Sequence, residues 1–248
     1  MNCLNNIHVI ILAGGKGTRM KNALPKCACE INGKPFVNHI IDTCSRILGV
    51  NDIVTVVGYK KEKIIALLPD FVKYAVQISQ LGTGDAVKCC RNLLEGKKGI
   101  TIIIPGDMPL VSADLINDLI DYHVQSKNAL TFVSTIMSDP KCYGRIYREN
   151  GQVKKIIEYK NCNKNQKKIN EINSSLYCID NSILFDYIDM IKPNELTGEY
   201  YLTDLVELIA VSKKADAYIK KYDYHLVGIN DSETLTKLVP LVNSESYN

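Results

Sequence analysis

The first half of the chain alternates short runs of β-branched residues with longer segments of helical periodicity. The strand-like runs are His8–Leu12, Asp52–Val57, Tyr74–Ile78, Ile100–Ile104 and Leu130–Thr135. The helix-like segments between them are Phe36–Leu48, Lys60–Leu67, Gly84–Leu94 and Ala113–Gln125. In the last of these, the apolar residues recur with the spacing of one helix face. Strands that alternate with helices predict an α/β fold, in which helices flank a mostly parallel sheet.

The pattern changes after about residue 140. The elements expected there are a hairpin of Gly144–Glu149 and Gln152–Tyr159, a strand at Ile172–Ile179 and a helix from about Gly198 to Ser212. Asn150-Gly151 between the hairpin strands is typical of a two-residue turn, because both positions tolerate positive φ. We interpret residues 1–248 as one domain, with a doubly wound first half and additional strands across the carboxyl edge of the sheet.

The composition is that of an ordinary globular protein. Of the 248 residues, 46% are hydrophobic and 23% are charged, and the formal net charge is +3. This charge is too small for the strongly basic surface of a nucleic-acid-binding domain. The longest apolar runs, Ile7–Ala13 and Ile100–Pro105, are far shorter than the ~18 residues of a membrane span. We therefore expect neither nucleic acid nor membrane as a partner.

The cysteines point to a reducing compartment. There are nine, an odd number, and most lie within apolar segments, as reduced thiols buried among hydrophobic residues do. Cys27 and Cys29 form the one pair near metal-ligand spacing, and no second Cys or His pair follows at a zinc-site distance. We expect a cytoplasmic protein without zinc.

A glycine-rich loop follows the first expected strand. Residues Leu12–Met20 read Leu-Ala-Gly-Gly-Lys-Gly-Thr-Arg-Met, and a glycine turn that leaves a parallel strand presents backbone N–H groups to an anion. The spacing fits neither a Walker A loop nor a dinucleotide-binding loop, because Gly17 follows Lys16 and Met20 replaces the last glycine. The cations of this loop are Lys16, Arg19 and Lys26. Together they favour a highly charged anion such as a triphosphate, although Lys16 alone is best interpreted as a solvated charge.

A candidate carboxylate follows the fourth expected strand. Asp107 lies between Gly106 and Met108-Pro109, just beyond a buried run, and so projects from the edge of the sheet where α/β proteins bind ligands. A carboxylate in this place suits Mg²⁺, which binds carboxylate and phosphate oxygens together. The alternative role, a helix cap, is already filled by Ser112 or Asp114.

Together these segments resemble the sugar-nucleotide pyrophosphorylases, which are nucleotidyltransferases with a Rossmann-like (glycosyltransferase-A-like) fold. The likeness is strongest to the uridylyltransferase domain of the bacterial N-acetylglucosamine-1-phosphate uridyltransferases. The matching segments are Leu12–Met20, Pro25-Lys26, Gln77–Ala86, Gly106-Asp107, Tyr143–Ile146, Ile156–Glu158, Glu171–Tyr177, Gly198–Asp204 and Gly228–Asn230. The resemblance implies a nucleotide-binding half at about residues 1–135 and a sugar-binding half at about residues 136–235.

The resemblance also implies which residues bind the nucleotide. The backbone of Leu12, Ala13, Gly14 and Gly15 would wrap it, and Gln77, Gly82 and Thr83 would contact uracil and ribose. An amide side chain at Gln77 suits uracil because it presents both a donor and an acceptor. The catalytic cations would be Arg19, against the β- and γ-phosphates of UTP, and Lys26, at the phosphate that joins nucleotide and sugar.

The metal and the sugar are assigned in the same way. Asp107 and Asn230 would ligate Mg²⁺, which tolerates a sparse protein shell because it keeps several waters. The sugar-binding residues would be Gly106, Asp107, Gly144, Glu158, Asn173 and Asn230. Among them, Glu158 would accept hydrogen bonds from sugar hydroxyls, and Gly144 would leave space near the N-acetyl group. Tyr201 and Thr203 fall in a matching motif and are interpreted first as packing residues.

The implied reaction converts N-acetylglucosamine 1-phosphate and UTP into UDP-N-acetylglucosamine and pyrophosphate. It needs no general base, because the attacking phosphate oxygen is already ionised. Two alternatives stay open: a pyrophosphorylase for another sugar or base, such as glucose 1-phosphate with UTP or dTTP, and a non-catalytic module that binds nucleotide sugars.

Three features depart from the bacterial pattern. Gly14 stands where those enzymes usually carry alanine, and Pro105 stands where the well-known ones carry tyrosine. No hexapeptide repeat of the kind that follows this domain in the bacterial proteins occurs after Asn230. From this we expect no acetyltransferase activity, and a homo-oligomer stays open.

Overall fold

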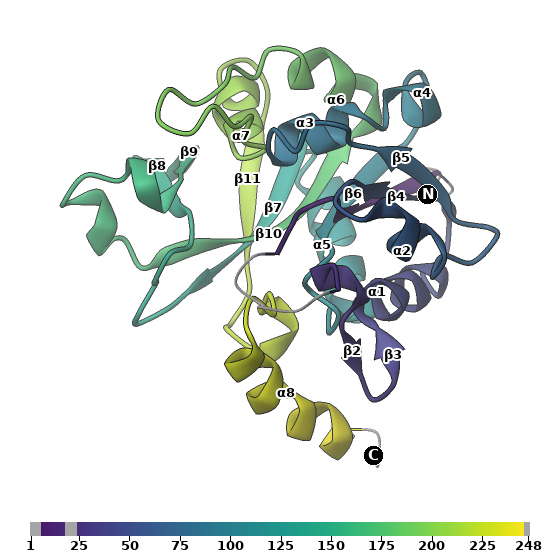
Figure 1. Ribbon diagram of the computed structural model, residues 1–248. Coiled ribbons are helices and arrows are strands. Elements are labelled where there is room, and N and C mark those ends of the chain that lie inside the picture. The colour runs from purple at the N-terminus through teal and green to yellow at the C-terminus, as the bar shows by residue number, and fades with distance from the viewer. Residues whose placement is uncertain (1–5, 18–23, 246–248) are drawn as a thin grey trace.

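A mixed β-sheet runs through the centre of the molecule (Figure 1). The computed structural model describes residues 6–17 and 24–245. In order across the sheet, the main strands are β11 (Ala215–Ile219), β7 (Leu130–Ile136), β10 (Glu171–Asp180), β6 (Ile100–Pro105), β1 (Ile7–Ala13), β4 (Val50–Val57) and β5 (Lys73–Val76). Strands β6, β1, β4 and β5 are parallel, whereas β10 runs antiparallel to both of its neighbours. The expected mostly parallel, mixed sheet is therefore confirmed.

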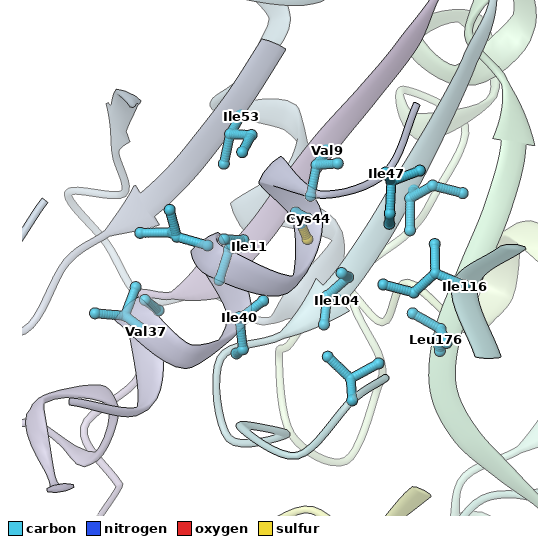
Figure 2. Close-up of a cluster of buried hydrophobic side chains, with 14 of the residues drawn as sticks. Val9, Ile11, Val37, Ile40, Cys44, Ile47, Ile53, Ile104, Ile116 and Leu176 are labelled. Atoms are coloured by element: carbon cyan, nitrogen blue, oxygen red, sulfur yellow. The ribbon is translucent and has the colours of Figure 1, made fainter. Parts of the chain in front are cut away.

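Helices cover both faces of this sheet. On one face lie α1 (Phe36–Ser45), α2 (Lys61–Ile65) and α5 (Ala113–Gln125). On the other lie α3 (Thr83–Lys88), α4 (Arg91–Leu94), α6 (Asn181–Ile188) and α7 (Asp204–Ala210). Because successive strand residues point to opposite faces, Val9 and Ile11 pack with the first group and Ile10 packs with the second. Figure 2 shows the first cluster, in which the β1 side chains meet Ile40 and Cys44 of α1.

The hairpin expected in the second half is present as β8 (Arg145–Glu149) and β9 (Gln152–Ile157). Its turn residues, Asn150 and Gly151, have φ of 51° and 79°. The hairpin pairs with the sheet only near its start, through Arg145 and Ile172 of β10, and extends to one side of the molecule (Figure 1). A register shift in β10 between Asn173 and Tyr177 interrupts its pairing with β7 at this point.

A third apolar cluster joins the end of the described chain to an early loop. Ile229 and Leu238 pack against Cys29, Ile31 and Phe36. Leu238 belongs to α8 (Ser232–Glu245), and the early loop contains β2 (Glu30–Ile31) and β3 (Lys34–Pro35). The short 3-10 helices within the described ranges are η2 (Lys26–Ala28), η3 (Tyr159–Asn161), η4 (Gln166–Lys168) and η5 (Tyr224–Leu226).

Several expected helices have different bounds. The segment Phe36–Leu48 is helical only to Ser45, Lys60–Leu67 only over Lys61–Ile65, and Gly84–Leu94 is divided between α3 and α4. The helix expected from Gly198 begins only at Asp204, because Tyr200 uses its backbone to bind the loop before α3. Its N–H donates to the carbonyl of Leu81 at 2.7 Å, and its carbonyl accepts from the N–H of Gly84 at 2.8 Å.

Two further properties concern the helices and the cysteines of the described residues. None of the helices there combines the length and the apolar character that crossing a bilayer requires. The eight cysteines in the described ranges are free thiols, and burial raises the pKa of the Cys44 thiol to about 12.

Candidate active site

A cavity of about 840 Å³ lies at the carboxyl ends of the parallel strands. The loops after β1, β5 and β6 form one side of it, and the residues that flank the β8–β9 hairpin, β10 and the segment before α7 form the other. Of the site residues predicted from the sequence, those that line it are Leu12, Gly14, Gly15, Lys26, Gln77, Gly82, Thr83, Gly106, Asp107, Glu158 and Asn230. Residues from segments far apart in the chain thus meet at one place.

Three other predicted residues, Ala13, Gly144 and Asn173, are not among the lining residues, and a fourth is not described. Arg19 falls within residues 18–23, outside the described part of the chain. Ala13 is buried at the end of β1, and Gly144 accepts the N–H of Asn173 on its carbonyl at 3.0 Å. Asn173 is buried behind the cavity wall, where its Nδ2 donates to the Tyr177 hydroxyl at 2.6 Å. In this structure Asn173 supports the wall, and Tyr177 faces the cavity.

Lys26, Asp107 and Asn230 form a bonded group. The Lys26 ammonium donates to the Asp107 carboxylate and, at 2.8 Å, to the Asn230 Oδ1. The backbone N–H of Ile229 donates to the Asp107 carbonyl at 2.7 Å, which brings the two loops together. The Asn230 Nδ2 donates to the Gly228 carbonyl at 3.1 Å, so its oxygen turns toward the lysine. The result is a cation between a carboxylate and an amide oxygen.

The same two oxygens suit a hard divalent cation. Carboxylate and amide oxygens are ligand types that Mg²⁺ accepts, and the lysine shows that the space between them admits positive charge. A Cβ at position 228 would lie 3.2 Å from Asp107 Oδ2, so glycine keeps this approach open. Within the described ranges, no group of three His, Cys, Asp or Glu side chains is placed to hold a metal ion. A metal at this pair would therefore depend on water and substrate oxygens.

Gln77 defines the nucleotide side of the cavity. Its backbone N–H donates to the Val57 carbonyl at 2.8 Å, and only 4% of the residue is exposed. The side-chain Nε2 donates to the Gly82 carbonyl at 2.9 Å and to Asp85 Oδ2 at 2.7 Å. Both amide hydrogens are therefore used within the protein. Of the donor and acceptor that the sequence led us to expect for uracil, only the acceptor, Oε1, is left to face a ligand.

Gly82 and Thr83 fix the loop that leads into α3. Gly82 has φ of 109°, and a Cβ there would lie 2.6 Å from the Tyr200 carbonyl oxygen, so this position requires glycine. The Thr83 Oγ1 accepts the backbone N–H of Leu202 at 2.9 Å. These contacts hold the segment before α7 against the nucleotide side of the cavity.

Glu158 lies on the sugar side. It follows β9 directly, and its Oε1 accepts a hydrogen bond from the Thr203 hydroxyl at 3.0 Å. Burial raises the pKa of Glu158, and the nearby charge of Glu199 adds to the rise. Burial, with Glu158 nearby, also raises the pKa of Asp204 to about 6. Beside Glu158, Gly144 is required because a Cβ would lie 2.9 Å from the Ile156 Cγ2.

Further residues line the cavity that sequence reasoning did not assign to ligand binding. They are Lys16, Gly17, Cys27, Gln80, Ala86, Pro105, Met108, Tyr143, Ser174, Ser175, Tyr177, Glu199, Tyr201, Leu202 and Thr203. Most of them fall within the segments on which the family resemblance is based, so membership in those segments was the sequence feature that could have identified them. Tyr201 and Thr203, interpreted first as packing residues, both reach the cavity, and Thr203 also orients Glu158.

Comparison with known proteins identifies the family. A family model described as the MobA-like NTP transferase domain matches residues 9–153. The chain belongs to the MobA-like NTP transferase family. This confirms the expected nucleotidyltransferase class and the resemblance on which that expectation was based.

Individual relatives agree with this assignment. The bifunctional protein GlmU of Clostridium novyi is 45% identical over 202 residues, which cover 81% of this chain and 44% of that protein. The GlmU of Clostridium perfringens (strain SM101) is 38% identical over 237 residues, which cover 95% of this chain and 52% of that protein. The chain thus spans about half the length of the curated relatives it matches.

A solved structure supports the fold. A Bacillus anthracis protein assigned as a glucose-1-phosphate thymidylyltransferase, crystallised with a sucrose, superposes with a TM-score of 0.72. The match covers 95% of this chain and 94% of that one, at 19% sequence identity. It confirms the single α/β fold with a mixed sheet flanked by helices.

Proposed function

We propose that this protein converts N-acetylglucosamine 1-phosphate and UTP into UDP-N-acetylglucosamine and pyrophosphate. The observation that carries the proposal is the meeting, in one cavity, of a charged centre, an acceptor for a base and a carboxylate for a sugar. The charged centre is Lys26 with Asp107 and Asn230, the acceptor belongs to Gln77 and the carboxylate to Glu158. The GlmU relatives support this choice of substrates.

The chemistry would depend on positioning and charge. A phosphate oxygen of the sugar ester attacks the α-phosphorus of UTP, the bond to the β-phosphate oxygen breaks, and pyrophosphate leaves. Lys26 would neutralise charge that develops on the transferred group. Asp107 and Asn230 would hold Mg²⁺, which when bound supplies further positive charge to the phosphates. The nucleophile is already ionised, so no side chain needs to remove a proton.

The two ends of the cavity would select the substrates. On the nucleotide side, Gln77 Oε1 would accept the N–H of uracil, and the loop at Gly14-Gly15 would pass close to the nucleotide. On the sugar side, Glu158 would accept from hydroxyl groups, with Thr203 holding one carboxylate oxygen in place. Thymine carries the same ring N–H as uracil, so dTTP belongs in any test of the base.

The test supplies purified protein and Mg²⁺ with each pairing of UTP, dTTP, CTP and ATP with four sugar 1-phosphates. Pyrophosphate release and the nucleotide sugar formed are both measured. We expect the highest kcat/KM for UTP with N-acetylglucosamine 1-phosphate. A preference for dTTP with glucose 1-phosphate would replace the proposed substrates. UTP binding without any turnover would show a non-catalytic nucleotide-sugar-binding module instead.

A further inference from the structure

The amide of Gln77 is fixed in one orientation by a neighbour outside the cavity wall. Asp85, in the first turn of α3, accepts from Nε2 at 2.7 Å, and the Gly82 carbonyl accepts from the same nitrogen at 2.9 Å. The reversed amide would place its oxygen against these two oxygens, which have no hydrogen to donate. Because both neighbours can only accept hydrogen bonds, the NH₂ group of Gln77 points toward them and the oxygen, Oε1, points away from them.

The free end of this amide points toward the glycine-rich loop. A Cβ built at Gly14 would lie 2.8 Å from Gln77 Oε1, so the oxygen rests against the backbone that is expected to wrap the nucleotide. No donor from the described residues is bonded to Oε1. The cavity thus presents, at a buried position, an acceptor whose direction the protein determines before any ligand arrives.

We propose that Asp85 is a positioning residue that sets the choice of base, by holding Gln77 so that the site accepts a ring N–H. This inference rests on the proposed function and deepens it. Uracil and thymine have an N–H at ring position 3, whereas cytosine has a lone pair there. A fixed acceptor favours the first two bases and repels the third. An amide free to rotate would serve either kind, because it could present its NH₂ group to cytosine.

The test compares nucleotide binding with and without this hydrogen bond. Affinities for UTP, CTP and 3-methyluridine 5′-triphosphate are measured by calorimetry with the wild type, Asp85→Ala and Asp85→Asn. The methylated nucleotide lacks the ring N–H and is otherwise close to UTP. Lys88→Ala is the matched control, because this exposed residue lies on the same helix and its ammonium pairs with Asp189 at 2.8 Å.

We expect the wild type and Lys88→Ala to bind UTP at least about tenfold more tightly than either other nucleotide. Asp85→Ala should reduce that ratio by about tenfold, because one of the two acceptors that orient the amide is lost. Asp85→Asn should retain most of the ratio, since its Oδ1 can accept the same bond. If Asp85 had only a general structural role, Asp85→Ala would weaken the binding of all three nucleotides alike and leave the ratio of affinities unchanged.

The outcomes separate this inference from the proposed function. An unchanged ratio in Asp85→Ala, with synthesis of the nucleotide sugar intact, overturns the inference and leaves the function standing. If UTP binding is selective and depends on Asp85 but no nucleotide sugar is formed, the inference stands and the proposed function is overturned. If Asp85→Ala does not fold, equal wild-type affinities for UTP and its methylated analogue still overturn the inference.

Discussion

Lys26 bonds to oxygens from two separate loops and thereby compensates the charge of Asp107. A partly buried carboxylate without a cation beside it would be costly. The lysine is partly buried as well, with 11% of its side chain exposed. Its ammonium is therefore kept inside the cavity by these two oxygens, and a Mg²⁺ ion bound to them would release it toward the phosphates of the substrate.

Removing this ammonium should affect the reaction far more than the fold. We expect Lys26→Ala to lower kcat roughly 10²–10³-fold, as is usual when one preorganised charge contact is lost. Initial rates at saturating substrates measure this, and thermal unfolding reports the fold. Lys16→Ala, a cation of the same cavity wall, is the matched control and should cost less. A loss of tenfold or less for Lys26→Ala would reduce Lys26 to a surface charge.

The Asp107 carboxylate gives a second prediction at this scale. Asp107→Asn keeps the shape of the side chain but removes the charge, so the Mg²⁺ concentration for half-maximal activity should rise. The melting temperature should stay close to that of the wild type. Asp114→Asn, at an exposed position of α5, provides the control and should leave the metal dependence unchanged. An unfolded Asp107→Asn would instead show that this carboxylate is structural.

The roles of single side chains were predictable to different degrees. The meeting of Lys26 with Asp107 follows from strand ends that share one edge of a parallel sheet. The orientation of Gln77 and the burial of Asn173 did not follow, because each depends on a particular neighbour. Asp85 directs the amide of Gln77, and the hydroxyl of Tyr177 holds that of Asn173. A motif identifies such residues but does not say which of their atoms remain for a ligand.

At the scale of elements, prediction succeeded where the determinants are local. Helix α5 has the bounds that its periodicity indicated, and Ser112 rather than Asp114 is its N-cap. By contrast, Tyr200 is held out of a helix by backbone bonds to Leu81 and Gly84, which lie more than a hundred residues earlier. No pattern within the segment from Gly198 to Thr203 reports those bonds, so a helix was expected there.

The cap of α5 can be tested directly. The Ser112 Oγ accepts the Leu115 N–H at 3.2 Å, and losing such a cap typically costs ~1 kcal/mol. We expect Ser112→Ala to lower the free energy of unfolding by that amount, measured by urea denaturation. Ser112→Asp and Ser112→Thr keep an oxygen in place and should unfold close to the wild type. Equal stability of the alanine and threonine variants would contradict the cap.

At the scale of the whole molecule, the edge of the sheet opposite the cavity has its own charged cluster. Asp52 of β4 accepts from His8 Nδ1 at 2.8 Å, and from Lys73 and Lys97 at 2.6 Å each. It thereby joins β1, β4 and β5 to the turn before β6. Burial alone would raise the pKa of Asp52, but the hydrogen bonds from the two lysines outweigh it and lower the pKa to about 2.

This cluster should make stability depend on pH without affecting catalysis. A carboxyl whose pKa is lowered on folding stabilises the protein fully at pH values above its ordinary pKa of about 3.9. This contribution is lost as the pH falls toward 2. We expect Asp52→Asn to lower the free energy of unfolding by about 1–3 kcal/mol at pH 7. The difference should shrink below about pH 4, while kcat stays unchanged. A constant difference down to pH 2 would exclude the carboxylate as its cause.

The bond from Ile229 to the Asp107 carbonyl has a consequence for the order in which the protein matures. On the ribosome, a nascent chain that has emerged as far as β11 already holds every strand of the sheet, together with Asp107. It still lacks the amide oxygen opposite that carboxylate, which arrives with residues 228–230. The strands of the described sheet can therefore pair before Asn230 is available, and the pair of oxygens that we propose for Mg²⁺ is completed only when residues 228–230 dock beside Asp107.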